Sequence, residues 1–321
     1  MVDRARKRAG RSERTVSVMA AMSKRWALFV LIGILFGSTP LSAQEKKSYT
    51  LEKINKFGAI YVGHREASVP FSYMDADGKA IGFSMELCGH VVEAVKAKLG
   101  RPHLDVVPVP TTSGTRQMMV ETGTIDLQCG SVTNTIQRQR YVAFSVTIFA
   151  AEVKALVHKD SGIRSIQDMK GKVVVTTSGT TSDIYVKAAA ARQGLFLNYR
   201  LGRDHDDSLR QLLNGSAHVM VLDDVLLQGL LMNAEEADAY KLVVLDESYA
   251  IEPYGLMFRR NDPEFKKLVD ETLVGLMQSG EFARIYDKWF MAPIPPLGKS
   301  LNLPMSDILQ QLIQTPNDRG I

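Results

Sequence analysis

A run of polar side chains at residues 129–140, with the sequence CGSVTNTIQRQR, has two chemical interpretations. The first is a capped helix, because Asn134 and Gln137 have the three-residue spacing of a capping box. The second is an anion site that adds Ser131 and Thr133 to Arg138. The N–H groups of a helix N-terminus and a guanidinium fork both suit a carboxylate. The run alone favours the capped helix, since caps are common.

Other polar loops follow predicted strands in the same way. Charged or hydroxyl-bearing side chains stand in five such loops, at 64–68, 111–116, 131–138, 177–182 and 223–224. In open α/β sheets, ligands bind at the carboxyl ends of the strands. Arg65 has no evident structural role between a strand and a Pro-Phe loop, other than a surface ion pair with Glu66. These loops are therefore candidates for one shared binding site.

Strands and helices alternate along the chain, which predicts an α/β fold with mainly parallel sheets. The predicted strands are 59–63, 104–109, 125–129, 172–176, 217–222 and 242–245, with extended segments at 144–149 and 153–157. The predicted helices are 48–55, 85–98, 115–122, 183–192, 207–214, 225–232, 263–277, 281–290 and 306–313. Apolar residues at helical spacing, such as Leu87, Val91 and Val95, support the second of these helices.

The N-terminal segment is predicted to be a secretory signal rather than part of the fold. Lys24 and Arg25 precede an apolar run at 26–37, and small residues follow it up to Ala43. The run is short for a membrane span. We expect cleavage between Ala43 and Gln44, which leaves an exported, periplasmic protein without a lipid anchor because no cysteine stands there. Whether the chain starts at Met1 or Met22 stays open.

Composition limits the classes of partner. The 321 residues are 45% hydrophobic and 23% charged, as in a globular protein of one or two domains with a sizeable core. Residues 1–43 hold eight basic and two acidic residues, so the formal charge of +4 becomes −2 once they are removed. This charge gives no basis for nucleic-acid binding.

Several signals for metals or cofactors are weak. The acidic loop from Asp75 to Glu86 has no glycine at its sixth position, which argues against calcium. Two cysteines without nearby histidine pairs, Cys88 and Cys129, make no zinc site, and export leaves a disulfide between them open. The sequence contains no P-loop, GxSxG or HExxH motif. We therefore expect no cofactor and no metal.

The motifs GHRE…PFSY, TSGTR, CGSVTNT, TTSGTTS, DHDDS and LDDVLL occur in this order along residues 63–227. The chain resembles, over about residues 48–300, a periplasmic amino-acid-binding protein of an ABC importer (bacterial extracellular solute-binding protein family 3). It is most similar to the glutamate/aspartate-binding branch. The resemblance implies two α/β lobes, each a mainly parallel sheet flanked by helices, which are joined by two hinge strands near 146–153 and 245–253 and close around a ligand. The implied bounds are 44–147 with 250–300 for lobe 1, 148–249 for lobe 2 and 301–321 for a tail.

The resemblance also implies roles for the polar loops. The ligand's α-carboxylate would bind Ser131, Thr133, Arg138, Thr180 and Thr181, and its ammonium would bind Asp223. The distal carboxylate would bind Arg65, Ser113, Arg116 and His205. Three arginines and one aspartate then leave an excess positive charge that suits an acidic amino acid. Asp224 would be a helix cap or a solvated residue.

Alternatives stay open for individual residues and for the function. His205 is either a ligand residue, whose pKa would rise beside a carboxylate, or a solvated loop residue before a helix capped by Asp206 or Asp207. The rival functions are a binding protein for glutamine or a dicarboxylate, and a dehydratase-type enzyme that uses Glu66 or Glu86. We expect a monomeric binding protein without catalytic activity, which delivers L-glutamate and L-aspartate to a membrane permease.

Overall fold

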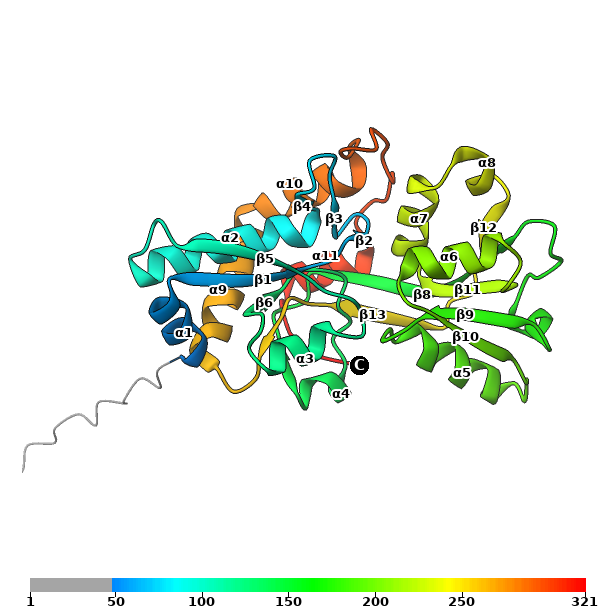
Figure 1. The fold of residues 1–321 in the computed structure, drawn as a ribbon, viewed down its shortest axis with the longest axis horizontal. Coiled ribbons are helices and arrows are strands. Elements are labelled where there is room, and N and C mark those ends of the chain that lie inside the picture. Colours follow the sequence, from blue (N-terminus) through cyan, green and yellow to red (C-terminus); the bar gives the residue numbers. More distant parts are fainter. Residues whose placement is uncertain (1–47) are drawn as a thin grey trace, which may run out of the picture. The chain divides into compact units, whose positions relative to one another are not determined.

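The computed structural model describes residues 48–321, which belong to one compact unit (Figure 1). The predicted signal sequence and its cleavage point after Ala43 lie outside these residues. Within the described part of the chain, no helix has the length and apolar character needed to cross a membrane.

The first sheet contains five strands in the order β5-β1-β6-β14-β7. These strands are β1 (Ala59–His64), β5 (Asp105–Pro110), β6 (Leu127–Gln128), β7 (Val142–Phe144) and β14 (Met257–Arg259). β1 pairs in parallel with β5 and β6, whereas β14 runs antiparallel to β6 and β7. The parallel centre places the carboxyl ends of β1, β5 and β6, with the polar loops that follow them, at one end of the sheet.

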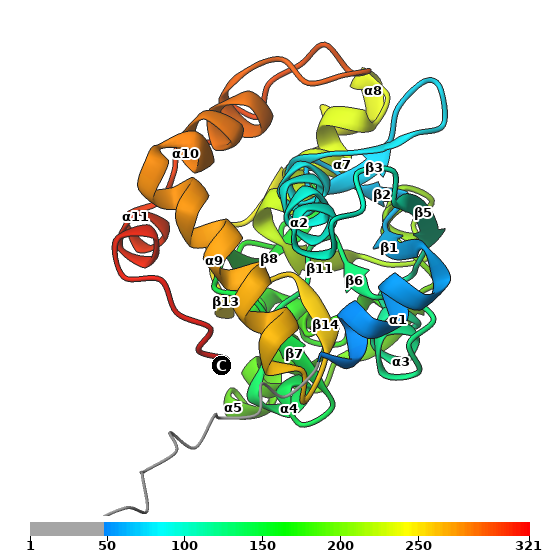
Figure 2. The same ribbon diagram turned by 90° about the vertical axis from the view of Figure 1, so that its left-hand side faces the viewer.

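The helices of this part include the two longest in the described chain. They are α1 (Tyr49–Phe57), α2 (Phe83–Leu99), α3 (Arg116–Glu121), α4 (Ile136–Gln139), α9 (Pro263–Ser279) and α10 (Glu281–Tyr286), which a π-helical turn (Asp287–Met291) continues. α2, α9 and α10 pack against one another (Figure 2). Local chemistry sets the limits of α9, because Asp262 caps its start and Gly280 ends it with a positive φ.

The second sheet has the order β10-β9-β11-β8-β12, and β13 also pairs with β8. Its strands are β8 (Phe149–His158), β9 (Val173–Thr177), β10 (Asn198–Gly202), β11 (Val219–Asp223), β12 (Leu242–Val244) and β13 (Ala250–Tyr254). Its helices are α5 (Ser182–Arg192), α6 (His205–Leu213), α7 (Asp224–Asn233), α8 (Glu236–Ala239) and a 3₁₀ helix (Ile166–Met169). β9 runs parallel to β10 and β11, which brings the loops after β9 and β11 to one end of this sheet. A small third sheet contains β2 (Ala67–Ser68), β3 (Ser72–Met74) and β4 (Ala80–Ile81).

Two paired strands carry the chain between the two large sheets. β8 and β13 run antiparallel, with Phe149 opposite Tyr254 and Val153 opposite Ala250. We call the first sheet with its helices, together with the small third sheet that contacts α2, the first lobe. The second sheet with its helices is the second lobe. The two-lobe α/β fold is as predicted. The exact residue bounds of the lobes and of the tail stay a prediction.

A disulfide joins Cys88 of α2 to Cys129, which follows β6. The sequence left this bond open. The hydroxyl of Ser84 in the same helix also donates to the carbonyl oxygen of Gly130, at 3.1 Å. Both contacts hold the start of the polar 131–138 loop against α2.

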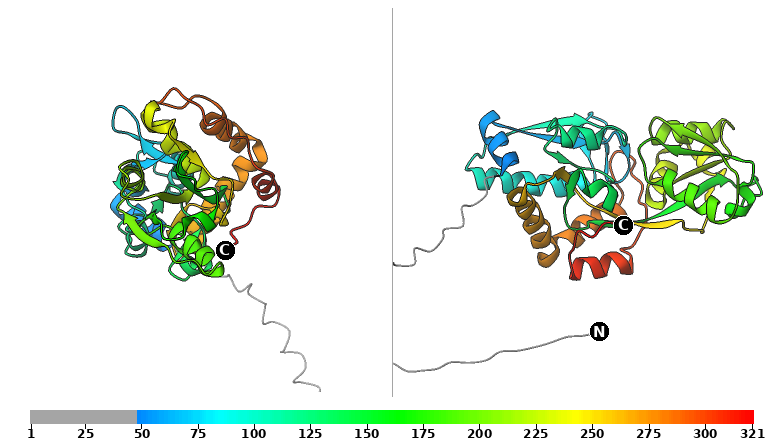
Figure 3. Two further views of the ribbon diagram at one scale, coloured as in Figure 1. Left: turned by 90° about the vertical axis from the view of Figure 1, so that its right-hand side faces the viewer. Right: turned by 90° about the horizontal axis from the view of Figure 1, so that it is seen from below.

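The C-terminal residues pack onto the first lobe and the crossover. Helix α11 (Asp307–Gln314), near the predicted 306–313, contacts α9 and β8 (Figure 3). The chain then continues to the 131–138 loop, where Ile321 donates its N–H to the carbonyl oxygen of Asn134 and accepts from the N–H of Ile136. The tail therefore supports the loop that bears Arg138.

Candidate functional site

Eight of the ten predicted ligand residues line one small cavity. They are Ser113, Arg116, Ser131 and Thr133 from the first lobe, and Thr180, Thr181, His205 and Asp223 from the second. The remaining two, Arg65 and Arg138, hydrogen-bond to residues of this set. The cavity has a volume of about 10 Å³, which is room for about one water molecule. An amino acid enters this site only if its walls move apart.

A cationic group of side chains occupies the part of the site assigned to a distal carboxylate. Arg65 donates from Nη1 to the hydroxyl of Ser113 at 2.8 Å, and Arg116 donates from Nη1 to the carbonyl oxygen of Ser131 at 2.7 Å. His205 Nδ1 lies 2.9 Å from the hydroxyl of Thr177. All three side chains are buried. Arg65 Nε and His205 Nε2 have no hydrogen-bond partner among the described residues, so the Nε–H group of Arg65 is free to donate to an incoming acceptor.

Electrostatics in this group favour an incoming anion. Burial lowers the pKa of Arg65 to about 10 and that of Arg116 well below its usual value, and Arg65 and Arg138 lower the pKa of Arg116 further. Burial, followed by the charges of Arg65 and Arg116, lowers the pKa of His205 well below its usual value. His205 is therefore neutral near pH 7 beside two cations. A bound carboxylate would oppose all of these shifts.

Arg65 does not form the surface ion pair with Glu66 that the sequence allowed. Its side chain is only 3% exposed and turns toward Ser113. No ion pair within 4.0 Å joins Arg65 or Arg116 to a carboxylate of residues 48–321. Two buried guanidinium groups without an anionic partner are costly. This cost indicates a binding function rather than a structural one.

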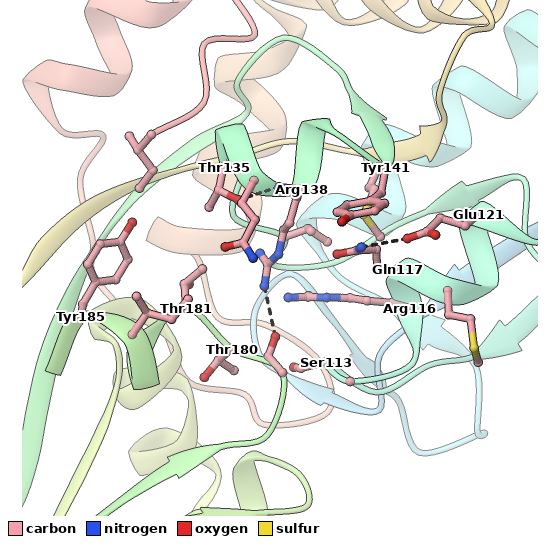
Figure 4. A pocket seen from close by; sticks show the side chains of 18 residues that line it. Ser113, Arg116, Gln117, Glu121, Thr135, Arg138, Tyr141, Thr180, Thr181 and Tyr185 are labelled. Atoms are coloured by element: carbon pink, nitrogen blue, oxygen red, sulfur yellow. Dashed lines mark hydrogen bonds between the residues drawn. The ribbon is translucent and has the colours of Figure 1, made fainter. Parts of the chain in front are cut away.

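Arg138 reaches from the first lobe to the second (Figure 4). Its Nη1 donates to the carbonyl oxygen of Thr133 at 2.8 Å, and its Nη2 donates to the carbonyl oxygen of Gly179 at 3.1 Å. Helix α4 is capped by Thr135, whose hydroxyl accepts from the N–H of Arg138 at 3.1 Å. The predicted capping by Asn134 is therefore wrong. Its side chain donates instead to the carbonyl oxygen of Asp318, because the tail packs there.

The start of α6 also differs from the prediction. The helix begins at His205 and is capped by Asp204, whose Oδ1 accepts from the N–H of Asp207 at 2.7 Å. Neither Asp206 nor Asp207 is the cap. The earlier start turns His205 into the site as the first helical residue, so the alternative of a solvated loop histidine is wrong.

Asp223 and Asp224, at the end of β11, have different surroundings. Asp223 is buried, and its Oδ1 accepts from the hydroxyl of Ser182 at 3.4 Å. Its Oδ2 accepts from the hydroxyl of Tyr254. Asp224 is neither the side-chain cap of α7 nor fully solvated. Its Oδ1 accepts from the N–H groups of Val225 and of Glu152 in β8, which links α7 to the crossover.

The sequence did not reveal that the crossover strand β13 contributes to the site. Glu252 is fully buried, and its Oε2 accepts from the hydroxyl of Thr133 at 2.7 Å. Tyr254, two residues later, donates to Asp223. Side chains two residues apart in a strand point to the same face. The spacing of Glu252 and Tyr254 in the predicted hinge strand was therefore the sequence signal that both contribute to one site.

A larger cavity adjoins the small one. It has a volume of about 490 Å³ and shares four lining residues with the small cavity, namely Ser113, Arg116, Thr180 and Thr181. Arg138, Tyr141 and Tyr185 also line it (Figure 4). Its size is in the range of small-molecule sites. Within residues 48–321 no three His, Cys, Asp or Glu side chains are grouped to hold a metal ion.

The chain matches the family model of bacterial extracellular solute-binding proteins, family 3, over residues 60–292. It is 44% identical over 272 residues to the glutamate/aspartate import solute-binding protein of Salmonella typhimurium, which covers 85% of this chain and 89% of that relative. It is also 44% identical over 284 residues to the L-glutamate/L-aspartate-binding protein of Pseudomonas aeruginosa, with 88% and 93% covered.

Among solved structures, a mutant of ArgBP from T. maritima superposes with a TM-score of 0.65 and 26% sequence identity. The superposition covers 75% of this chain and 98% of that protein. The match to the family model, the relatives at 44% identity and the two-lobe fold agree with one another. The chain belongs to the bacterial extracellular solute-binding proteins of family 3.

Proposed function

We propose that this protein captures L-glutamate and L-aspartate in the periplasm and delivers them to the membrane permease of an ABC importer. The protein acts as a monomer, carries out no chemistry and closes its two lobes around the ligand. The names of its relatives support the choice of ligand. The signal sequence predicted at residues 1–43 supports the location.

The observation that carries this proposal is the group of Arg65, Arg116 and His205. These side chains come from both lobes, are buried together and have no carboxylate partner among residues 48–321. The distal carboxylate of an acidic amino acid supplies the missing anion. An amide in its place would leave the two guanidinium groups unpaired, so glutamine is disfavoured.

The other two charged groups of the ligand have matching partners. The α-carboxylate is assigned to Arg138 with the hydroxyls of Ser131, Thr133, Thr180 and Thr181. The α-ammonium is assigned to Asp223. Arg138 contacts both lobes through Thr133 and Gly179, so the α-carboxylate would bind where the lobes meet.

The structure does not favour the enzyme alternative. Glu86 binds the ammonium of Lys288 and the indole N–H of Trp289, each at 2.6 Å, and is thus engaged away from the site. Glu66 was the other acid considered as a catalyst, and it is absent from the linings of both site cavities.

Calorimetric titration against glutamate, aspartate, glutamine and succinate tests the proposal. We expect the acidic amino acids to bind about a hundredfold more tightly than glutamine, since hydrogen bonds to charged groups contribute about 1.5–3 kcal/mol each. Mass analysis after incubation should recover unchanged ligand. Tighter binding of glutamine would contradict the roles of Arg65 and Arg116, and tighter binding of succinate would contradict the role of Asp223.

A further inference from the structure

Glu252 is a buried carboxyl group for which the assigned ligand contacts provide no role. It lies on β13, is fully buried and accepts one hydrogen bond at Oε2, from the hydroxyl of Thr133 at 2.7 Å. Its other oxygen, Oε1, has no hydrogen-bond partner in the part of the chain that the structure describes. An ionised carboxylate with an unpaired buried oxygen is costly. The surroundings of Glu252 must therefore supply a cation or a proton.

A second buried carboxyl group, that of Asp223, lies near Glu252. Tyr254, two residues further along the same face of β13, donates its hydroxyl hydrogen to Asp223. Two carboxylates are both acceptors, so close contact between them requires a proton on one of the two. Burial raises the pKa of both residues, and the charge of Glu252 raises the pKa of Asp223 further. Like-charged carboxyls at close range retain a proton for this reason.

Two cations act on this pair: the charge of Arg138 lowers the pKa of Glu252 and that of Arg116 lowers the pKa of Asp223, but burial has the larger, opposite effect on both. Arg116 and Arg138 direct the hydrogen bonds described above to backbone carbonyl oxygens. No ion pair within 4.0 Å joins either arginine to the two carboxyl groups in the described part of the chain.

The other titratable groups around the pair come from three elements. Asp224 of α7 adds negative charge beside Asp223, and Tyr254 of β13 donates to Asp223. Burial, followed by the charges of Glu252 and Asp223, raises the pKa of Tyr185 of α5. Both tyrosines have raised pKa values and are neutral near pH 7. Neither therefore supplies a positive charge.

We propose that Asp223 and Glu252 share one proton in the free protein, and that the ammonium group of the bound amino acid displaces this proton into solvent. Asp223, which lines the small cavity, then accepts from the ammonium, while Glu252, which lies behind Thr133, supplies the second negative charge. The charge balances, because the departing proton and the arriving ammonium each carry one positive charge. This inference rests on the proposed function, which supplies the ammonium-bearing ligand.

Proton displacement predicts a pH dependence with a definite sign. Because binding releases a proton, affinity rises with pH while the free protein retains the shared proton, by up to about tenfold per pH unit. A dicarboxylate without an ammonium cannot displace the proton, and its carboxylate would face the pair. Glu252 thus also contributes to the selection of amino acids over dicarboxylates.

Calorimetry in phosphate and in Tris, whose ionisation enthalpies differ, counts the protons released on glutamate binding. We compare the wild-type protein with Glu252→Gln and with the control Glu152→Gln, a partly exposed carboxyl on the paired strand β8. The wild type and the control should release about one proton more than Glu252→Gln. Any proton that His205 takes up on binding is common to the proteins compared, so it cancels when the proton count of Glu252→Gln is subtracted from that of the wild type. An equal proton count in all three proteins would overturn the proposal.

An infrared measurement tests the shared proton without relying on ligand binding. The difference spectrum of the free wild-type protein minus free Glu252→Gln should show the C=O band of a protonated carboxyl, and circular dichroism checks that the variant is folded. In the wild type, glutamate should abolish this band. Absence of the band from the free wild type would overturn the proposal. If the band is present but neither glutamate nor aspartate binds, the shared proton stands and the proposed function fails.

Discussion

Buried arginines are the residues on which the proposed ligand preference depends. Arg65 and Arg116 have lost hydration without gaining an anion, and burial is the largest cause of the lowered pKa of each. Arg65 remains charged at neutral pH, since its lowered pKa is about 10. Such groups destabilise the free protein and are retained where a ligand completes their pairing.

Replacement of Arg65 by glutamine should separate binding from stability. We expect Arg65→Gln to weaken glutamate binding about tenfold to hundredfold, because a charge-assisted contact to the distal carboxylate is lost. The Tm of the free protein should stay the same or rise by a few degrees, because a desolvated charge is removed. Titration calorimetry and thermal unfolding measure the two effects.

The matched control is Arg192→Gln, at an exposed arginine in the last turn of α5. It should change neither affinity nor Tm appreciably, since exposed charges contribute little. A loss of stability in Arg65→Gln without a loss of affinity would assign Arg65 a structural role and contradict the site.

At the scale of elements, short segments hold the proposed ligand-binding side chains in position, and contacts with neighbouring segments stabilise them. Helix α4 has only four residues, so its own hydrogen bonds hold it weakly. The Thr135 cap, the tail residues near Ile321 and the disulfide after β6 support it and the preceding loop. The position of Arg138 therefore depends on contacts with distant parts of the chain.

Removal of the disulfide should lower both stability and affinity. Cys88 and Cys129 are 41 residues apart, and closure of a loop of this size contributes about 2–4 kcal/mol to the free energy of unfolding. We expect a double Cys88→Ala, Cys129→Ala variant to lose about this much in urea unfolding. Its affinity for glutamate should also fall, because the loop with Ser131 is no longer held against α2.

Reductant provides the control for this experiment. It should shift the urea midpoint of the wild type toward that of the double variant and leave the double variant unchanged. A wild-type midpoint that does not respond to reductant, under conditions that break the bond, would show that the disulfide does not stabilise the fold.

At the scale of the whole molecule, the two lobes contact each other at glycine residues, where the absence of a side chain lets the backbone of the other lobe approach closely. Gly229 of α7 faces Val69 in the first lobe, and a Cβ at this position would lie 2.3 Å from the carbonyl oxygen of Val69. Gly179 likewise faces Gly114, and a Cβ there would lie 2.6 Å from its Cα. Contact between the lobes in this arrangement therefore requires both glycines.

Gly229→Ala should weaken ligand binding without touching a ligand residue. The added methyl group obstructs the approach of α7 to Val69, so we expect at least a tenfold loss of glutamate affinity. Small-angle scattering should show a smaller contraction on addition of glutamate than in the wild type. Gly275→Ala is the control, because it is also a helical glycine and a Cβ there meets nothing within 4 Å.

The control should bind glutamate normally and gain up to about 1 kcal/mol of stability from the better helix propensity of alanine. If Gly229→Ala binds and contracts like the wild type, the observed approach of the two lobes is not needed for binding.

Local sequence signals determined much of the fold of this protein. The cap of α9 at Asp262 and its end at Gly280, the strand before Arg65 and the polar loops after strands are all readable from neighbouring residues. These signals are short-range, because caps, turns and strand alternation depend on residues a few positions apart. They therefore predicted the α/β class and the five loops that hold nine of the ten predicted ligand residues, all except His205.

Only the tertiary structure decided which residues from other parts of the chain contact those loops and complete the site. The polar edge strand β10 was not predicted, and α6 begins earlier than expected because Asp204 rather than Asp206 or Asp207 caps it. Asn134 binds the tail instead of capping α4. Glu252 joins the site because β13 pairs with β8 and brings its carboxyl group beside Thr133, 119 positions away. Contacts across such distances arise from packing, and no local pattern of residues encodes them.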